Sequence, residues 1–362
     1  MLIYVCSSSH GFGHAARDAA VLQQLRLLRP DWQLVMSSAV NAAFLTALLG
    51  DDTIQIRHCR WDVGVIQADA LGSDPPATLH ALAQLDADLP DLLQQEVQWI
   101  RSCREPVLVL ADVPPAAAQL ATALDAPLVW MSNFGWDDIY RPFGKAFHQQ
   151  VERIREAYAS GRVLLRCPFS LPMAWGLPEQ SLGLVCSQPR PLPPVLLDQL
   201  QEADQAWVQV GFGGMGLRLS PRLFAHWPQQ RFLMAAPIHP SDRAALTRVP
   251  NLTLLPEGVR PIDAFPFCAR HLGKPGFSTF SEAMALEVGL HVVERRGFAE
   301  VDALLEGLRN HGRHRFLNRE QLESGDWQLD QPLLEPTHPP MRSDGAQQAA
   351  RALVDLAERH AT

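Results

Sequence analysis

The sequence has little charge and no apolar run long enough to cross a membrane. Charged residues make up 19% of the 362 residues, and the net charge of −8 provides no basic excess for binding nucleic acid. A membrane-spanning helix needs about 20 consecutive apolar residues, and the sequence has no such run. We therefore predict no nucleic-acid partner and no transmembrane segment. Peripheral contact with a membrane is left open.

Cysteine is sparse as well. The six cysteines are scattered and form no Cys-x-x-Cys pair, which argues against a disulfide framework and a zinc site. The apolar N-terminus stops at Ser7 and has no basic residues before it, unlike a signal peptide. These absences predict a cytoplasmic protein with reduced thiols and no bound metal.

What is present is a globular composition, with 47% hydrophobic residues. At about 100–200 residues per domain, the length predicts two domains. Short apolar runs predict strands at 2–6, 33–36, 54–56, 106–111, 127–131, 207–210, 232–235, 252–255 and 291–293. Helical periodicity lies between them, at 18–28, 78–103, 116–124, 264–268, 280–288, 301–310 and 345–359. This alternation predicts parallel sheets covered by helices on both faces.

A proline-rich stretch divides the two halves. Seven prolines fall between Pro168 and Pro194, a density that disfavours helices and central strands. We therefore predict domains at 1–170 and 196–362 with a linker at 171–195, and the last helix is free to pack back on the first domain. The predicted fold is α/β, with two facing, doubly wound, Rossmann-like domains and a ligand in the cleft between them. Ligands of such sheets bind at loops that follow strands.

The first such loop, residues 7–14, contains two histidines and two glycines. Gly11 and Gly13 allow tight turns and close approach of a ligand. His10 and His14 are both candidate general bases because the imidazole pKa lies near neutrality. The alternative is an ordinary strand–helix turn with surface histidines. Zinc binding by His10 and His14 would need a helix, which the glycines oppose.

The second loop, residues 211–216, matches Gly-x-Gly-x-x-Gly. A dinucleotide site also needs an acidic residue at the end of the next strand, but Ala236 and Pro237 stand there. We therefore reject NAD. The backbone amides of Gly213 and Gly214 are candidates to hold a phosphate. The alternative is a structural turn.

The third loop, residues 272–283, runs into a predicted helix. Gly276 permits an unusual backbone angle, and Ser278 or Thr279 would cap the helix, whose free amides suit a pyrophosphate. Lys274 would add positive charge. The sequence Thr279-x-x-Glu282 is also a capping box, in which Glu282 needs no ligand.

Two further features follow predicted strands. The segment 132–138 mixes aromatic and polar side chains, including Asn133, Trp136 and Asp137, as a sugar pocket would. Its alternative is a surface loop with a packed tryptophan. Asp112 would either face the same cleft or cap the next helix.

Together these loops resemble the GT-B glycosyltransferases. Gly276, Thr279, Ser281 and Glu282 match the Gly-x-x-Thr-x-Ser-Glu of the N-acetylglucosaminyltransferase that makes lipid II, and the loop ending in Gly13-His14 is similar to its glycine-rich N-terminal loop. A stronger resemblance is to the glycosyltransferase-like half of plant-type L-arabinokinases. It covers His10-Gly11-Phe12-Gly13-His14-Ala15-x-Arg17, 132–140 and 272–282.

The resemblance implies roles for the candidate residues. A nucleotide-sugar, most simply a UDP-sugar, would serve as co-substrate, with no other cofactor and no metal. The acceptor would bind the first domain, where His14 or His10 removes its proton. In the second domain Gly213, Gly214, Lys274, Gly276, Ser278 and Thr279 would hold the diphosphate and Glu282 the ribose. The base would lie near 257–260, including Val259 and Arg260. Gly11, Gly13, Asn133, Trp136, Asp137 and Glu300 would line the acceptor or sugar pocket.

Departures from the family leave the reaction open. Phe277-Ser278 replaces small or aliphatic residues, and residues 294–300 lack the glutamine-rich loop of many relatives. Two alternatives therefore stand beside a glycosyltransferase: a sugar-nucleotide 2-epimerase and a non-catalytic or regulatory nucleotide-sugar-binding protein. The nucleotide, sugar, acceptor, stereochemical outcome and oligomeric state are not indicated.

Overall fold

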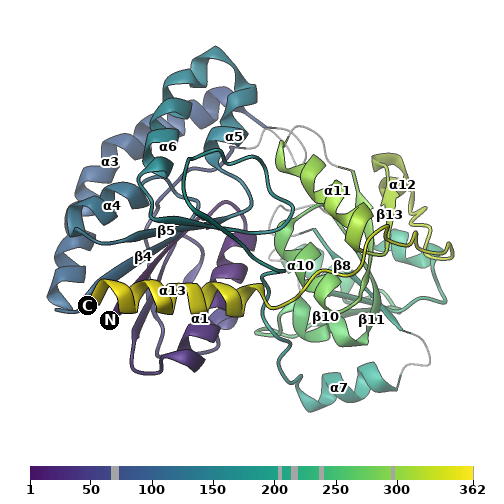
Figure 1. The fold of residues 1–362 in the computed structure, drawn as a ribbon. Coiled ribbons are helices and arrows are strands. Elements are labelled where there is room, and N and C mark those ends of the chain that lie inside the picture. The colour runs from purple at the N-terminus through teal and green to yellow at the C-terminus, as the bar shows by residue number, and fades with distance from the viewer. Residues whose placement is uncertain (67–72, 203–205, 213–218, 236–239, 295–297, 362) are drawn as a thin grey trace. The chain divides into compact units, whose positions relative to one another are not determined.

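The chain folds into two compact units in a computed structural model (Figure 1), which describes residues 1–66, 73–202, 206–212, 219–235, 240–294 and 298–361. Unit 1 comprises residues 1–187, 297–303 and 342–362, and unit 2 comprises residues 188–296 and 304–341. None of the helices in the described ranges is both long and apolar enough to span a bilayer.

Unit 1 contains a seven-stranded parallel sheet in the order β3-β2-β1-β4-β5-β6-β7. Its central strands are buried apolar runs, because helices cover both faces of the sheet. The strands are β1 (Leu2–Ser7), β2 (Gln33–Ser37), β3 (Gln55–Arg57), β4 (Val107–Asp112), β5 (Leu128–Ser132), β6 (Val163–Arg166) and β7 (Glu179–Ser181).

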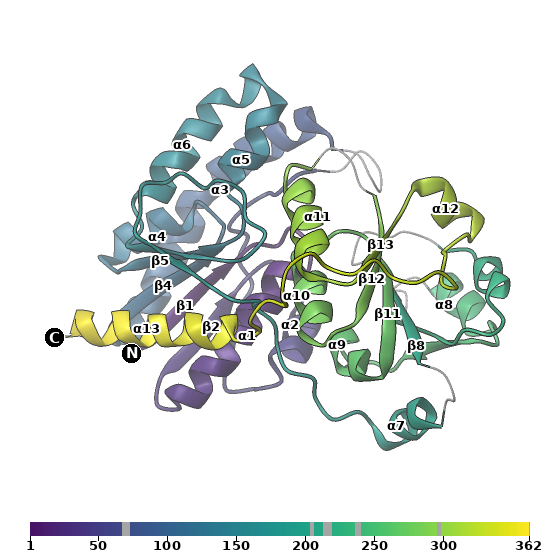
Figure 2. The ribbon, with the colours of Figure 1, turned by 45° about the vertical axis from the view of Figure 1, so that its right-hand side comes forward.

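The helices of unit 1 include the last helix of the chain. In Figures 1 and 2, α13 lies alongside α1, with which it makes extensive contact. The helices are α1 (Gly13–Leu28), α2 (Ala42–Leu49), α3 (Pro75–Ser102), α4 (Ala117–Leu124), α5 (Trp136–Tyr140), η1 (Arg141–Phe143), η2 (Lys145–Phe147), α6 (His148–Ala159) and α13 (Gly345–Ala361). The helix α11 (Glu300–His311) begins in unit 1 and continues into unit 2.

Unit 2 contains a six-stranded parallel sheet in the order β10-β9-β8-β11-β12-β13. Its strands are β8 (Trp207–Gly211), β9 (Phe232–Ala235), β10 (Leu252–Leu255), β11 (Cys268–Gly273), β12 (Gly289–Val293) and β13 (His314–Leu317). Its helices are α7 (Pro194–Gln201), η3 (Pro221–His226), α8 (Pro240–Leu246), α9 (Pro261–Ala264), η4 (Phe265–Phe267), α10 (Phe277–Ala285) and α12 (Arg319–Ser324).

The structure corrects one expectation about these elements. The helix expected over 264–268 is wrong, because α9 and η4 end there and Cys268 starts the central strand β11. The sequence hides β11 because Arg270 and His271 interrupt its apolar pattern. Within the proline-rich stretch, β7 extends the sheet of unit 1 as an edge strand, where nearby prolines are tolerated.

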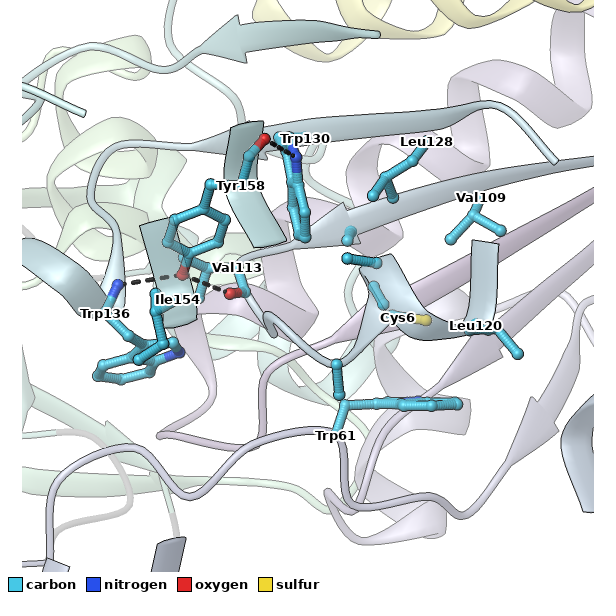
Figure 3. Packing of buried hydrophobic residues seen from close by; sticks show 14 of the residues in the cluster. Cys6, Trp61, Val109, Val113, Leu120, Leu128, Trp130, Trp136, Ile154 and Tyr158 are labelled. Carbon is cyan, nitrogen blue, oxygen red and sulfur yellow. Dashed lines mark hydrogen bonds between the residues drawn. The ribbon is translucent and has the colours of Figure 1, made fainter. Parts of the chain in front are cut away.

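The core of unit 1 is rich in aromatic residues. Figure 3 shows Tyr158 among the buried side chains of this core, where its hydroxyl donates to the carbonyl of Val113 at 2.8 Å and accepts from the amide of Trp136 at 3.1 Å. The indole of Trp130 donates to the carbonyl of Tyr158 at 2.9 Å. These bonds satisfy the polar ends of buried rings and fix the segment that follows β5.

Both sheets are doubly wound: successive strands are added first on one side of the starting strand and then, after one reversal, on the other side. In unit 1 the strand order reverses between β1 and β4, and in unit 2 between β8 and β11. Ligands of open parallel sheets bind beyond the carboxyl ends of the strands at such reversals. The loops singled out from the sequence follow β1, β5, β8 and β11, so three of them flank a reversal point.

Candidate active site

The reversal point of unit 1 holds a buried histidine–carboxylate pair. His14 lies in the first turn of α1, and Asp112 ends β4. The His14 Nδ1 lies 2.9 Å from an Asp112 Oδ1, and their exposed fractions are 7% and 0%. The Arg17 Nη2 also lies 3.1 Å from this nitrogen, but it donates to the carboxylate, and an ionised carboxylate can only accept, so the neutral imidazole is protonated at Nδ1. His14 therefore presents Nε2 as its basic nitrogen.

Arg17 binds the same carboxylate and completes the cluster. Its Nε donates to one oxygen of Asp112, and its Nη2 donates to the other at 2.5 Å. Burial alone would raise the pKa of Asp112, but the charges of Arg17 and His14 outweigh burial and lower it. Asp112 is therefore ionised and can stabilise a protonated His14. It does not cap the next helix, which has no side-chain cap.

Asn133 connects this cluster to Glu300. The Arg17 Nη1 donates to the Asn133 Oδ1 at 2.6 Å, and the Asn133 Nδ2 donates to the Glu300 Oε1 at 2.8 Å. Asn133 follows β5, and Glu300 begins α11 within unit 1. Both were candidates for a sugar pocket, and the structure brings them together beside His14. Arg17 and Asp112 were not singled out for this role, because their partnership depends on neighbouring strands rather than on a motif.

The second candidate base, His10, has a different chemistry. Its Nδ1 accepts from the amide of Val65 at 3.3 Å, so in the neutral ring the proton sits on Nε2. The ring stacks on Phe298 at 5.8 Å and meets Trp136 edge-on at 5.3 Å. Gly11 has φ +82°, so that turn needs a glycine. His10 therefore offers a donor rather than a basic nitrogen, and His14 is the better base.

Trp136 and Asp137 have partners that sequence patterns do not reveal. Trp136 is buried, and its Nε1 donates to the Asp62 Oδ2 at 2.9 Å. Trp136 and Asp62 both line a cavity of about 90 Å³ among α3, α4, α5 and α6. Asp137 accepts from Trp175 Nε1 and Arg155 Nε, each at 3.4 Å, so its carboxylate braces α5. The loop around Asp62 contains no recognisable motif, and that residue was missed.

The reversal point of unit 2 is built from closely packed glycines. Gly211 ends β8 and pairs in register with Gly273, which ends β11. A Cβ on Gly273 would come within 2.4 Å of the Gly211 carbonyl oxygen, so no larger residue fits. Lys274 follows directly and is half-buried. Gly213 and Gly214 lie outside the described residues.

The helix α10 starts without a side-chain cap. Gly276 is its N-cap residue and has no side chain with which to cap the helix. The expected caps Ser278 and Thr279 instead lie inside the first turn, so the capping-box interpretation of Glu282 is wrong. A Cβ on Gly276 would meet no atom of the described residues within 4 Å. The N-terminal end of α10, where the helix dipole favours negative charge, is therefore not filled by a side chain of its own cap residue.

Glu282 lies one turn further along α10 and is partly buried. Burial raises the pKa of Glu282 to about 7, partly opposed by Arg260 and reinforced by Asp263. Within the described part of the chain, no hydrogen bond to its carboxylate is present. Glu282 therefore keeps acceptor capacity for a ligand hydroxyl.

Val259 and Arg260, the candidates for binding the base, form a turn held by internal bonds. The Arg260 guanidinium is 5% exposed, pairs with Asp263 at 2.6 Å and donates to the carbonyl of Gln188 at 2.8 Å. The amide of Val259 donates to the carbonyl of Pro256 at 3.2 Å. The guanidinium is thus occupied, and a base would meet mainly backbone groups of this turn.

Comparison with known proteins supports the architecture. No family model matches the sequence. An L-arabinokinase of Arabidopsis thaliana is 28% identical over 330 residues, which cover 88% of this chain but only 31% of the relative. The chain thus spans about a third of the length of that protein.

Solved structures of GT-B glycosyltransferases resemble both sheets. Arabidopsis thaliana UGT89C1 in complex with UDP-L-rhamnose gives a TM-score of 0.60 at 16% identity, covering 99% of this chain and 94% of that one. A UDP-glucosyltransferase from Polygonum tinctorium, capable of glucosylating indoxyl, gives 0.60 at 14% identity, covering 99% and 93%. Acinetobacter baumannii MurG gives 0.52 at 15% identity, covering 99% of each chain. The chain has the GT-B fold, as its sequence predicted.

Proposed function

We propose that this GT-B chain is a glycosyltransferase that moves a sugar from a nucleotide-diphosphate donor to an acceptor hydroxyl, without a metal ion. The observation that carries the proposal is the buried His14–Asp112 pair, which presents a basic Nε2 beside the reversal point of unit 1. UDP and UDP-L-rhamnose are bound in structures of UGT89C1. A UDP-sugar is accordingly the donor that we propose here.

In this mechanism His14 takes the proton of the attacking hydroxyl. As the oxygen bonds to the anomeric carbon of the donor sugar, its proton moves to Nε2 of His14, and the bond from that carbon to the diphosphate breaks. Asp112 holds the Nδ1 proton in place and compensates the imidazolium charge. Asn133 and Glu300 are proposed to orient the acceptor or the sugar.

The donor diphosphate is proposed to bind unit 2. The N-terminal end of α10 would supply amide donors and the positive end of the helix dipole, and both would stabilise negative charge as it develops on the leaving diphosphate. Lys274, Ser278, Thr279 and the loop with Gly213 and Gly214 would contribute further donors. Glu282 would accept hydrogen bonds from the ribose, and the turn of Val259 and Arg260 would flank the base.

The first test is a thermal-shift screen with UDP-, GDP-, ADP- and dTDP-sugars, followed by turnover measurements on His14→Ala. A transferase should be stabilised by its donor. His14→Ala should retain that shift but lose about 100-fold or more in sugar transfer to a panel of acceptors. The exposed His148 offers a matched control, since His148→Ala should change neither.

Other outcomes of this test point to other functions. Sugar interconversion without an acceptor would indicate an epimerase. Donor binding without turnover in the wild type would indicate a binding module, as the similarity to part of an L-arabinokinase allows. No thermal shift with any nucleotide-sugar would refute the donor site.

A further inference from the structure

A buried histidine lies directly beneath the glycine ends of β8 and β11. His271 is 4% exposed, and it sits in β11 two residues before Gly273. A Cβ built on Gly273 would come within 2.5 Å of the His271 Nε2, and a Cβ built on Gly211 would come within 3.1 Å of the His271 Cε1. The imidazole therefore lies against the backbone at the reversal point of unit 2.

The hydrogen bonds around His271 determine which nitrogen carries the proton. The Gln209 Nε2 donates to the carbonyl of Pro261 at 2.9 Å, so the amide oxygen of Gln209 is the atom that faces His271. The His271 Nδ1 lies 3.1 Å from that oxygen and must donate to it. The neutral ring is therefore protonated at Nδ1. Its Nε2 is buried and has no hydrogen-bond partner within the described residues.

Burial lowers the pKa of His271 to about 4. The carbonyl of Gly211 acts in the opposite direction, because it can accept a hydrogen bond from a protonated Nε2 and so favours the protonated ring. Among the described residues, the groups around the ring add no charge: Gln209 on β8, the ring of Phe265 at 5.6 Å, and His291 on β12, whose pKa burial lowers to about 3. Without a ligand the ring is neutral, and a lone pair faces a carbonyl.

We propose that His271 takes up a proton from solvent at Nε2 when a nucleoside diphosphate binds at the ends of β8 and β11, and that the resulting imidazolium helps to hold the diphosphate. This inference rests on the proposed function. The negative charges of the ligand stabilise the imidazolium form of His271, which no charge stabilises in the free site among the described residues, because charges interact strongly where water is excluded. The new Nε2–H then donates to the Gly211 carbonyl. The site gains a cation only when the anion is present.

The test compares proton uptake on UDP binding in the wild type and His271→Gln. Calorimetric titrations at pH 6 in buffers of different ionisation enthalpy give the number of protons bound per UDP. Protons exchanged by UDP itself or by Glu282 are common to both proteins and cancel in the difference. We expect the wild type to take up about 0.3–1 proton more than His271→Gln. His271→Gln should bind UDP about tenfold more weakly at pH 6 and nearly equally at pH 8.5.

A second buried histidine provides the control, and a spectroscopic readout avoids any folding defect of the variant. His314→Gln removes an imidazole of the same sheet, two strands away, and should leave the proton count unchanged. In wild-type protein with nitrogen-15-labelled histidine, the Nε2 resonance of His271 should change from bare to protonated when UDP is added. Failure of the wild type to bind UDP would refute the proposed function itself. UDP binding with equal proton uptake in both proteins, or an unchanged Nε2 resonance, would refute the role of His271 alone.

Discussion

At the scale of single residues, Asp112 is the group on which the proposed chemistry depends most. It is fully buried and bound by both His14 and Arg17. We expect Asp112→Asn to lower kcat by about 100-fold or more, because an amide can donate to Nδ1 and so turn the proton of His14 toward Nε2. Initial rates of sugar transfer measure this loss. Calorimetry should find the donor Kd unchanged, and retained activity would exclude His14 as the base.

Glu282 links stability to pH. Its pKa is raised from 4.5 to about 7 by burial, so between these values the folded protein binds more protons than the unfolded chain. Stability therefore falls as pH rises through this window. We expect Glu282→Gln to be more stable than the wild type by about 1–2 kcal/mol at pH 8, after discounting for partial exposure, and equal to it at pH 4. Urea unfolding at both pH values decides this, and a pH-independent difference would contradict the shift.

The individual partners were the part of the site least visible in the sequence. His14, Asn133, Glu300 and Glu282 could be selected because they stand in loops after expected strands. Arg17, Asp112, Asp62 and His271 act through neighbours that are 50 to 100 residues away in the chain or that lie on adjacent strands. No local pattern encodes such contacts. They become visible only when the strand order is known.

At the scale of elements, substitutions of two glycines near the start of α10 should have different effects, one on ligand binding and the other on stability. A Cβ on Gly276 would enter open space, whereas a Cβ on Gly273 would strike the Gly211 carbonyl and His271. We expect Gly276→Ala to keep its thermal stability but to weaken UDP binding, because the methyl group narrows the approach to the amides of α10. Gly273→Ala should cost about 1–3 kcal/mol of stability.

Thermal unfolding and calorimetric titration of both glycine variants provide the measurement. The pair acts as its own control, since each adds one methyl group. Unchanged UDP affinity in Gly276→Ala would show that the diphosphate binds elsewhere.

Elements with continuous apolar runs were the easiest to predict. The expected strands at 232–235 and 252–255 coincide with β9 and β10. By contrast, β6 is a run of three apolar residues that ends in Arg166, and β13 contains Arg315. The strand β7 is exposed and polar, and β11 carries Arg270 and His271. Strand formation there is imposed by pairing with neighbours, which local composition does not report.

At the scale of the whole molecule, the last helix is a structural part of unit 1. In α13, Ala349, Ala350, Leu353 and Ala357 are fully buried, and the helix packs against α1. We expect removal of residues 342–362 to destabilise unit 1 selectively. Amide hydrogen exchange should accelerate in α1 and leave β8 and β9 largely unchanged. Leu353→Ala is a milder version and should cost about 2–5 kcal/mol. Equal acceleration in both sheets would contradict the assignment of α13 to unit 1.

The discontinuous path of the chain also has a consequence for biosynthesis. Unit 1 takes residues 1–187 from the part of the sequence synthesised before unit 2, and α13 from the part synthesised after it. The surface of α1 that α13 covers therefore stays exposed on the nascent chain until α13 has been synthesised. The ribosome thus delivers the later lobe ready to fold before the earlier one can close, a reversal of the usual vectorial order.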